Sequence, residues 1–367
     1  MIIGVVSDTH SDRANALPHV MAQFKQRGVQ LIIHCGDIEP KHVDPALFLN
    51  LPVICALNKE QLDKPAFARE PEGWVFTKPE DRVRSLEDML VYVGHRGSFD
   101  FLKGTQNDMA SLLENIRKAH DGLRWYFSGH THHQIMLQTQ LVRFVNPGAV
   151  EVGFDGYEYA VVDTNTFEVV FSRILPTKPL AVNHFVGIIS DSLNISTTDG
   201  DFWSSLATEF HKRGVGTVVH CGNISIDDVG RKELEGFQVY YNLRKDQKDP
   251  ASVPGNWLRI GGLATGDLPV VSINGHRIYV ELDLGLDLLE QSELKMSMKS
   301  LELRRKYPEI SYIFCGFTHS TLFAEGNEIK IINPGDAIKD RNFVVLCLPR
   351  GEVTFGHVPM APLPALD

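Results

Sequence analysis

The chain is poor in cysteine, and none of its cysteines is paired at metal-binding or redox spacing. Five cysteines occur among 367 residues, and no CxxC motif is present. The number is odd and four of the five lie in apolar, strand-like runs, so we expect buried free thiols in a reducing compartment. This argues against a disulfide framework and against a thiolate-bound structural zinc.

The chain also lacks excess positive charge and long apolar runs. It carries 36 Lys and Arg against 46 Asp and Glu, a formal net charge of −10. A broad nucleic-acid or anionic-membrane surface needs Lys and Arg, so we expect neither partner. No 18-residue apolar run and no signal-like N-terminus is present, so we expect a soluble, cytoplasmic protein. A small phosphorylated substrate stays compatible, because bound metal would reverse the local charge.

An internal repeat is the most informative feature. Four motifs of the first half return in the second: SDTH (7–10) as SDSL (190–193), HCGD (34–37) as HCGN (220–223), GHTH (129–132) as GFTH (316–319), and NPG (146–148) as NPG (333–335). Gly222 follows Gly36 by 186 residues, and Asn333 follows Asn146 by 187 residues. Such a fixed period indicates a repeat. It predicts two domains, residues 1–177 and 183–367, with a proline-containing linker at 175–184.

Apolar periodicity predicts an α/β (α+β) fold. Residues 2–6 and 31–35 are apolar, β-branched runs typical of buried strands, and the apolar residues between 17 and 24 have helical spacing. The chain therefore opens strand–helix–strand, as a parallel unit does. Further strands are predicted at 52–57, 90–93, 123–129, 143–146, 158–164 and 167–174, and a helix near 106–119. Segment 60–80, with its prolines and charges, is expected to form a surface loop or hairpin.

Seven polar side chains follow predicted strands or the turns that end them. They are Asp8, His10, Asp37, Asn58, His95, His130 and His132. Ligands bind at the carboxyl ends of strands in open α/β sheets, so we expect these side chains to converge at one edge. Each motif alone has a structural explanation, such as a helix cap or a turn, but the whole set does not.

The donor types point to a pair of metal ions. One divalent ion takes about four to six ligands, so seven donors suit two ions that share a carboxylate. Asp37 is the natural bridge, because a carboxylate has two oxygens to offer. Imidazole, carboxylate and amide donors without thiolate favour Mn, Fe or Zn.

The second copy has lost most of these donors. Leu193, Asn223, Arg244, Leu282 and Phe317 stand where the first copy has His10, Asp37, Asn58, His95 and His130, and only Asp191 and His319 are retained. Two donors should not hold two metals. We therefore expect a second domain that folds without a complete metal site. We expect it to pack on the first as the partner in an intrachain pseudo-dimer, with further oligomerisation left open.

The motifs SDTH, HCGD, GHTH and NPG, with Asn58 and His95, resemble the calcineurin-like metallophosphoesterases. The resemblance is strongest to the small bacterial and archaeal phosphodiesterase (YfcE-like) branch, which also contains the retromer scaffold subunit. It covers nearly the whole first half and, in weaker form, the second. It implies a two-sheet β-sandwich flanked by helices, present twice. It also implies a dimetal site, often with Mn²⁺, and with Fe, Zn or Ni as alternatives.

The resemblance also assigns roles by motif position. One metal would be held by Asp8, His10, Asp37 and His132, and the other by Asp37, Asn58, His95 and His130. Direct catalytic roles fall to Asp37, Asn58 and His95. The implied activity is that of a phosphoric ester hydrolase, in which a metal-bridging hydroxide attacks phosphorus in line. Asn146, Pro147 and Gly148 match a segment that shapes the strand after the site.

Three neighbouring residues are candidate substrate contacts. Lys59 stands where many relatives have a His that protonates the leaving group, and it is either a phosphate-binding charge or a solvated lysine. Arg96 is a substrate contact or a surface residue, and His133 is an acid or an exposed neighbour of His132. The missing acid and the subgroup resemblance favour phosphodiesters over monoesters.

Two other classes of function compete with a small-molecule hydrolase. A catalytically weak scaffold or protein-interaction module of the same fold is the main alternative, and the complete ligand set of the first half speaks against it. A nuclease is disfavoured by the acidic chain and the absence of a basic stripe.

Overall fold

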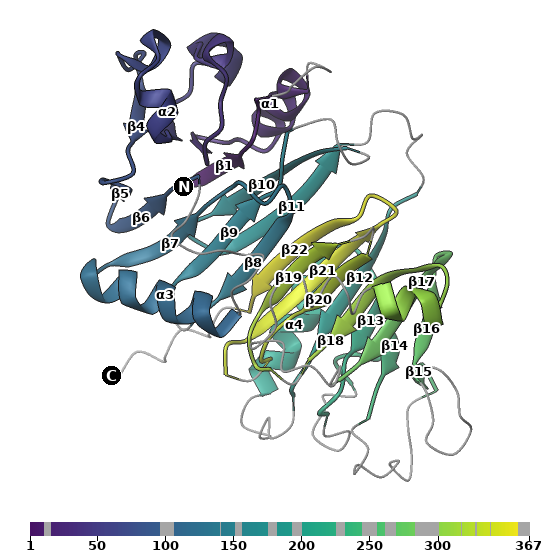
Figure 1. The fold of residues 1–367 in the computed structure, drawn as a ribbon. Helices are drawn as coiled ribbons and strands as arrows, with labels where there is room; N and C mark the ends of the chain where they lie inside the picture. Colours follow the sequence, from purple (N-terminus) through teal and green to yellow (C-terminus); the bar gives the residue numbers. More distant parts are fainter. Residues whose placement is uncertain are drawn as a thin grey trace. The chain divides into compact units, whose positions relative to one another are not determined.

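The computed structural model describes most of the chain. The described residues are 1–10, 16–95, 106–139, 141–150, 156–174, 182–192, 200–224, 232–243, 255–260, 269–282, 301–316, 318–326, 329–337 and 339–358. They form two compact units, which Figure 1 shows as ribbons. Unit 1 contains the described first half together with the later strand β19 (Leu322–Gly326), and unit 2 contains most of the described second half. The predicted linker at 175–184 falls largely outside the described residues.

The first sheet of unit 1 has the strand order β11-β10-β1-β2-β3-β4. Its strands are β1 (Ile2–Val6), β2 (Leu31–His34), β3 (Val53–Ala56), β4 (Trp74–Thr77), β10 (Tyr157–Asp163) and β11 (Glu168–Ile174). The first four are parallel to one another, and β10 runs antiparallel to both β1 and β11. The carboxyl ends of β1, β2 and β3 therefore lie at the same edge of the sheet.

The second sheet of unit 1 has the strand order β19-β8-β9-β7-β6-β5. Besides β19, its strands are β5 (Val83–Leu86), β6 (Met89–Val93), β7 (Leu123–Phe127), β8 (Gln134–Gln138) and β9 (Arg143–Pro147). Strands β6, β7 and β9 are parallel, whereas β5 and β8 are antiparallel to their neighbours. Strand β19 pairs antiparallel with β8.

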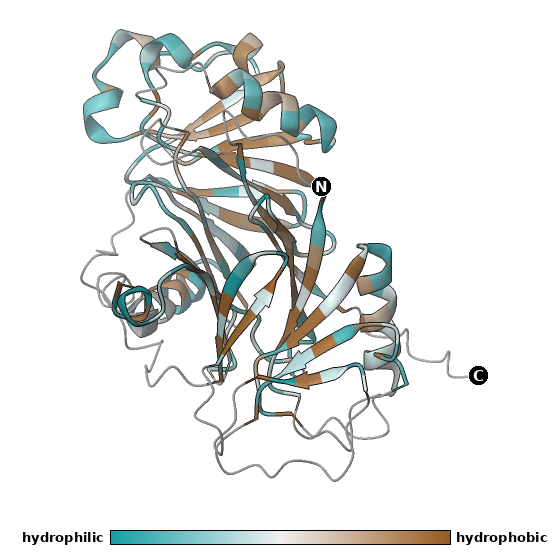
Figure 2. Ribbon diagram, turned by 90° about the vertical axis from the view of Figure 1, so that its right-hand side faces the viewer, coloured by the Kyte–Doolittle hydropathy of each residue, from teal (hydrophilic) through white to brown (hydrophobic). Residues whose placement is uncertain are grey.

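Helices cover both sheets of unit 1. The buried face of α1 (Leu17–Gln26) packs on the first sheet, and α3 (Gln106–Ala119) packs on the second, where Leu113 joins a cluster with Tyr126 and Phe144 (Figure 1). The sheets meet each other where β10 contacts β9 and β3 contacts β6. Most strands are strongly hydrophobic, whereas the helices carry hydrophilic residues as well (Figure 2). The predicted α/β fold of two sheets flanked by helices is confirmed.

Among its described strands, unit 2 repeats the strand order of the first sheet and of β5, β6, β7 and β9 in the second, without a counterpart of β8. One sheet runs β15-β14-β13-β12-β21-β22 and the other runs β16-β17-β18-β20. The strands are β12 (His184–Ile189), β13 (Val215–His220), β14 (Gln238–Tyr241), β15 (Trp257–Arg259), β16 (Val270–Ile273), β17 (His276–Glu281), β18 (Ile310–Cys315), β20 (Ile329–Asn333), β21 (Asn342–Leu348) and β22 (Glu352–His357). Its helix α4 (Gly200–Lys212) follows β12 as α1 follows β1.

One close contact shows why both units need a glycine in their first strand. A Cβ atom on Gly4 would lie 2.5 Å from the ring of Phe24 on α1, and one on Gly187 would lie 2.7 Å from the ring of Phe210 on α4. Since real Cβ atoms do not approach so closely, each helix can pack at this distance only on a glycine.

Segment 60–80 differs from the prediction of a surface loop or hairpin. It begins within α2 (Lys59–Leu62) and then contains a 3₁₀ turn at Pro65–Phe67 and β4, which pairs parallel with β3. The prediction was wrong for β4, because Trp74 and Phe76 are buried against the core.

Two further 3₁₀ turns lie at Pro40–His42 and Pro45–Phe48. No described helix has the length and hydrophobicity that a bilayer-spanning segment requires.

Because β19 belongs to unit 1, we expect residues 1–177 to be incomplete when expressed alone. The fragment leaves β8 as an unpaired sheet edge, which favours self-association. Light scattering should detect oligomers, and β8 peptides should exchange hydrogen faster than in the full chain. A monomer with full-chain protection of β8 would contradict this expectation.

Candidate metal centre

Asp8 is a fully buried carboxylate at the end of β1. Its Oδ2 atom accepts the backbone N–H of His130 at 3.0 Å, whereas its buried Oδ1 atom receives no hydrogen bond. The Oδ1 atom lies 3.3 Å from Nε2 of His132 and 3.8 Å from Nε2 of His95. A buried carboxylate oxygen without a hydrogen-bond donor is costly, and a cation would relieve that cost. These residues therefore fit a metal ion.

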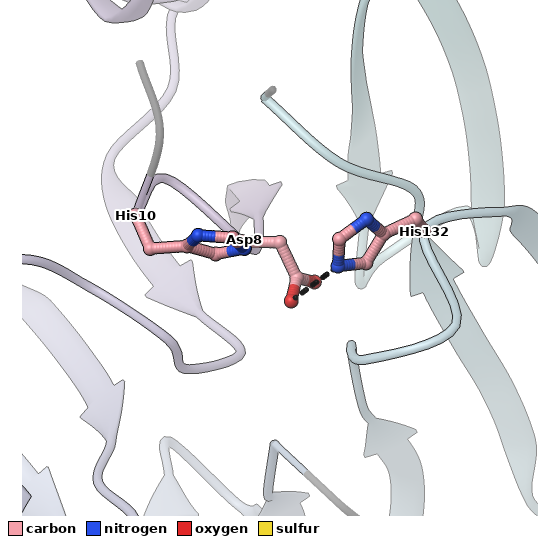
Figure 3. A group of neighbouring side chains, drawn as sticks. All are labelled: Asp8, His10 and His132. Atoms are coloured by element: carbon pink, nitrogen blue, oxygen red, sulfur yellow. Dashed lines mark ion pairs between the residues drawn. The ribbon is translucent and has the colours of Figure 1, made fainter. Parts of the chain in front are cut away.

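Two groups of candidate ligands share Asp8. In one group, the donor atoms of Asp8, His10 and His132 lie within 4.8 Å of one another, and in the other the same holds for Asp8, Asp37 and His95. Figure 3 shows the His10 and His132 rings on either side of the Asp8 carboxylate. Asp37 also approaches the first group, because its Oδ2 atom lies 3.6 Å from Nε2 of His10. The structure thus brings together five of the seven predicted ligands.

The other two predicted ligands are His130, which follows β7, and Asn58, which precedes α2. The centre of the His130 ring lies 5.1 Å from that of His95. Asn58 caps α2, since its Oδ1 atom accepts the N–H of Gln61 at 2.8 Å while Gln61 Oε1 accepts the N–H of Asn58 at 3.0 Å. A carbonyl oxygen can accept twice, so the cap leaves one lone pair of Asn58 for a metal.

A backbone carbonyl fixes the orientation of the His95 ring. Nδ1 of His95 lies 3.1 Å from the carbonyl oxygen of Cys35, which can only accept, so Nδ1 carries the proton in this hydrogen bond. The lone pair of Nε2 then points toward Asp8 Oδ1, 3.8 Å away. Without a metal, a proton on Nε2 makes the ring cationic and offsets the repulsion between these two electron-rich atoms, and a bound cation would replace that proton. A ligating histidine whose other nitrogen donates to a carbonyl is a common arrangement in metal sites.

The charge state of Asp8 suits a cation. Burial by itself would raise the pKa of this carboxyl, but His132 and His95 outweigh burial and hold the pKa below its usual range. Asp8 is therefore ionised at neutral pH and brings a full negative charge to the site.

The strand-end turns place these ligands in left-handed backbone conformations. Four predicted ligands have positive φ: Asp8 (54°), Asp37 (54°), His130 (78°) and His132 (59°). For non-glycine residues this conformation costs about 1 kcal/mol or more each. Unit 2 keeps the same turns, with φ of 56° at Asp191, 56° at Asn223 and 53° at His319. The strained turns therefore belong to the fold, and the side chains decide whether they carry a metal.

Two motif glycines set the approach of these turns. A Cβ atom on Gly36, where φ is 104°, would lie 2.3 Å from Cβ of His95. One on Gly129 would lie 2.9 Å from Asp8 Oδ2 and 1.8 Å from Ser7 Oγ. Glycine in HCGD and GHTH therefore lets the ligands meet.

The histidine of HCGD has a structural role. Nδ1 of His34 accepts the N–H of Gly36 at 3.1 Å, so Nε2 carries the proton and donates to Thr9 Oγ1 at 3.0 Å. In unit 2, His220 makes the same bonds to Gly222 and to Ser192. Burial lowers the pKa of each ring to about 3, so both are neutral at physiological pH.

The predicted substrate contacts are placed only in part. Lys59 is an exposed residue at the start of α2. His133 is partly buried, and its pKa is lowered mainly by burial, against the opposing charge of Glu325. Arg96 lies outside the described residues. The substrate-binding roles of all three stay predictions.

Unit 2 satisfies the corresponding carboxylate without a metal. Asp191 Oδ1 accepts Nδ2 of Asn223 at 3.0 Å, and its Oδ2 accepts the hydroxyl of Ser190 at 2.9 Å. Leu282 packs beside Gly222 as His95 packs beside Gly36. No metal-holding group of His, Cys, Asp or Glu was found in the described part of unit 2. Leu193, Arg244 and Phe317 lie outside that part.

Comparison with known proteins indicates the family to which the first half of the chain is similar. The model of the calcineurin-like phosphoesterase superfamily domain matches residues 1–166. A probable metallophosphoesterase of Methanocaldococcus jannaschii is 30% identical over 154 residues, covering 41% of this chain and 69% of the relative. One of Methanothermobacter thermautotrophicus is 28% identical over 153 residues, covering 41% and 78%. A solved archaeal phosphodiesterase shares 21% identity at a TM-score of 0.36, covering 47% of this chain and 100% of its own.

A two-sheet fold in which Asp and His side chains after strands of both sheets cluster together is the arrangement of a metallophosphoesterase type of protein. The chain belongs to the calcineurin-like phosphoesterase superfamily.

Because both ligand groups share Asp8, replacing it should remove most metal binding. We expect Asp8→Asn to lose at least about tenfold in Mn²⁺ affinity, since the neutral amide keeps the bond from His130 but not the charge. Titration calorimetry on the metal-free full chain measures this. The matched control is Asp191→Asn in unit 2, which should bind Mn²⁺ like the wild type. Equal affinities for all three proteins would contradict the assignment.

The buried neutral ring of His220 should make stability depend on pH. Its folded pKa, about 3, lies below the ordinary value of 6.5, so the unfolded chain binds the extra proton first. The free energy of unfolding should fall as pH drops from about 6.5 toward 3, by at most on the order of 5 kcal/mol from this ring. His220→Gln should flatten this dependence in urea titrations. An unchanged slope would show that the ring does not stay neutral.

Proposed function

We propose that unit 1 is a metal-dependent phosphoric ester hydrolase. The observation that supports this best is the Oδ1 atom of Asp8, which is buried, receives no hydrogen bond and lies within 3.8 Å of imidazole nitrogens of His95 and His132. Membership of the calcineurin-like phosphoesterase superfamily supports phosphoester cleavage as the chemistry of this site.

We further propose that the seven predicted ligands hold two divalent ions, with Mn²⁺ as the first candidate for their identity. Such a pair, when bound, activates water and neutralises charge on the phosphoryl oxygens. Asp8 and Asp37 supply the negative charge that gathers the ions. The Cys35 carbonyl keeps His95 in the tautomer that leaves Nε2 available. Asp37 is proposed as the bridge, because it lies near members of both groups.

A small phosphodiester is the proposed substrate class. Lys59 follows Asn58 where many members have a histidine, and an ammonium group is a weaker proton donor near neutral pH than an imidazolium. A phosphate oxygen is the proposed partner of Lys59, with Arg96 and His133 as further contacts. Diesters with good leaving groups depend least on protonation of that group.

The second half is proposed to be a duplicated copy without a metal pair. Its matching order of the shared strands and its glycine–phenylalanine contact support a common origin. The hydrogen bond from Asn223 to Asp191 supports the absence of a metal there. Pseudo-dimeric association of the halves stays a prediction. A role of the second half in binding other proteins is the second candidate function.

Activity should follow the metal and depend on Asp37. With added Mn²⁺, we expect the wild type to cleave a generic aryl phosphodiester faster than the matching monoester. Asp37→Ala should reduce kcat by about 100-fold or more, because it removes a predicted bridging ligand. Asn223→Ala, the corresponding change in unit 2, should leave activity unchanged. Failure of the wild type to cleave either ester, with or without metal, would refute the proposed function.

A further inference from the structure

A strand from the second half of the sequence brings a carboxylate into unit 1. Strand β19 pairs with β8 so that Phe323 lies opposite Met136 and Ala324 lies opposite Ile135. The ring centre of Phe323 lies 4.9 Å from that of Phe171 on β11, so the strand is anchored in the core of unit 1. Glu325 follows in this strand, and its side chain is only 9% exposed.

Glu325 closes a buried network of three charges. Glu158 and Arg173 lie directly opposite each other in β10 and β11, and Nε of Arg173 donates to Glu158 Oε1 at 3.1 Å. Nη2 of Arg173 also donates to Glu158, and to Glu325 Oε1 at 2.8 Å. Burial would lower the pKa of Arg173, but the two carboxylates outweigh it and raise the pKa. The guanidinium is therefore held between two fixed negative charges.

This network adjoins the exit of the loop that carries His130 and His132. Gln134, two residues after His132, donates from Nε2 to the carbonyl oxygens of Tyr159 at 3.2 Å and Ser172 at 2.9 Å. Tyr159 and Ser172 are the chain neighbours of Glu158 and Arg173. One further step of the β8–β19 register places Glu325 opposite Gln134.

The network also adjoins the entrance of the same loop through the NPG motif. Glu158 packs on Gly148, where a Cβ atom would lie 2.0 Å from Glu158 Oε2. The N–H of Gly148 donates to Asn146 Oδ1 at 3.1 Å. Nδ2 of Asn146 donates to the carbonyl oxygen of Gly129 at 3.1 Å and to Thr131 Oγ1 at 3.0 Å. Contacts thus run from the charged network to both ends of the ligand loop.

Unit 2 offers an internal comparison. The cross-strand pair that corresponds to Glu158 and Arg173 is Asn342 and His357, in strands with the same place in the sheet. Asn342 donates to Thr321 Oγ1 at 3.0 Å instead of binding a charged partner. The unit with the complete ligand set has the charged pair, and the unit whose Asp191 is satisfied by an amide does not.

We propose that Glu325 is a positioning residue for the metal site of unit 1: through Arg173 and Glu158 it fixes the loop that places His130 and His132 around Asp8. The second half of the chain thereby takes part in the geometry of the site through one strand. This inference rests on the metal site of the proposed function. It assigns Glu325 no contact with metal or substrate.

Mn²⁺ affinity of the metal-free full-length chain tests the positioning role directly. Glu325→Gln keeps the size of the side chain and an acceptor for Arg173, but it removes the charge that holds the guanidinium. We expect Mn²⁺ binding by titration calorimetry to weaken roughly 3- to 10-fold, the range for changes transmitted through packed contacts. Glu325→Asp keeps the charge but shortens the reach to Arg173, and it should weaken Mn²⁺ binding less than Glu325→Gln does. It also serves as the test if Glu325→Gln folds poorly.

Two controls separate positioning from simple loss of stability. Phe323→Leu removes the ring contact with Phe171 but leaves the charges and the backbone pairing of β19 with β8, so it should lower the thermal midpoint while weakening Mn²⁺ binding less than Glu325→Gln does. Glu114→Gln breaks an exposed pair with Arg117 in the same unit and should change neither property.

The outcomes distinguish this inference from the proposed function. If the wild type binds Mn²⁺ and both Glu325 variants bind it equally well, the positioning role is wrong while the metal site stands. The same conclusion follows if Phe323→Leu weakens Mn²⁺ binding as much as Glu325→Gln does. If the wild type binds no divalent ion, the metal site fails and the positioning role fails with it.

Discussion

The buried carboxylate of Asp8 is the constraint on which the site depends. It lies at the end of the first strand, away from water, with one oxygen bonded to the backbone of the ligand loop and the other facing two imidazole nitrogens. An ionised group in such a place is stable only if opposite charge compensates it. The nearby histidines compensate the charge of Asp8 in part, and a divalent ion would compensate it fully. Asp8 therefore holds the loop that carries His130 and His132 against the first sheet, and its buried charge favours a bound metal ion.

Unit 2 resolves the same constraint by other means. Its Asp191 occupies a turn of nearly the same φ as Asp8, and Asn223 occupies that of Asp37. Exchanging a carboxylate for an amide turns a repelling neighbour into a donor, so the hydrogen bond between Asn223 and Asp191 takes over the compensating role. Leu282 occupies the place that His95 has in unit 1. An imidazole there would have no cation to bind. The backbone of these turns is nearly the same in both units. A few side chains decide whether a hydrogen bond or a cation balances the charge of the aspartate.

Much of this could be predicted from local sequence. The helix at Gln106–Ala119 and most strands of unit 1 follow directly from apolar periodicity, and polar residues at strand ends indicated the five side chains that the structure brings together. The cap on α2 was not predicted, although Asn58 and Gln61 have the spacing of a capping box. The central place of Asp8 was not, because it depends on burial and on which oxygen lacks a donor. Strand β4 was missed because the prolines and charges before Trp74 hid a short buried strand.

The pairing of β19 with β8 is the part that sequence could not give. Cross-strand partners such as Glu158 and Arg173 are set by register, and Glu325 joins them from more than 150 residues away. Buried ion pairs add little net stability compared with apolar packing, so their value lies in holding groups at defined positions. In unit 1 those groups are the two ends of the ligand loop. Under the proposed positioning role, the sequence of β19 is constrained by the candidate metal site of unit 1, although β19 lies in the half of the chain that keeps only Asp191 and His319 of the predicted donors.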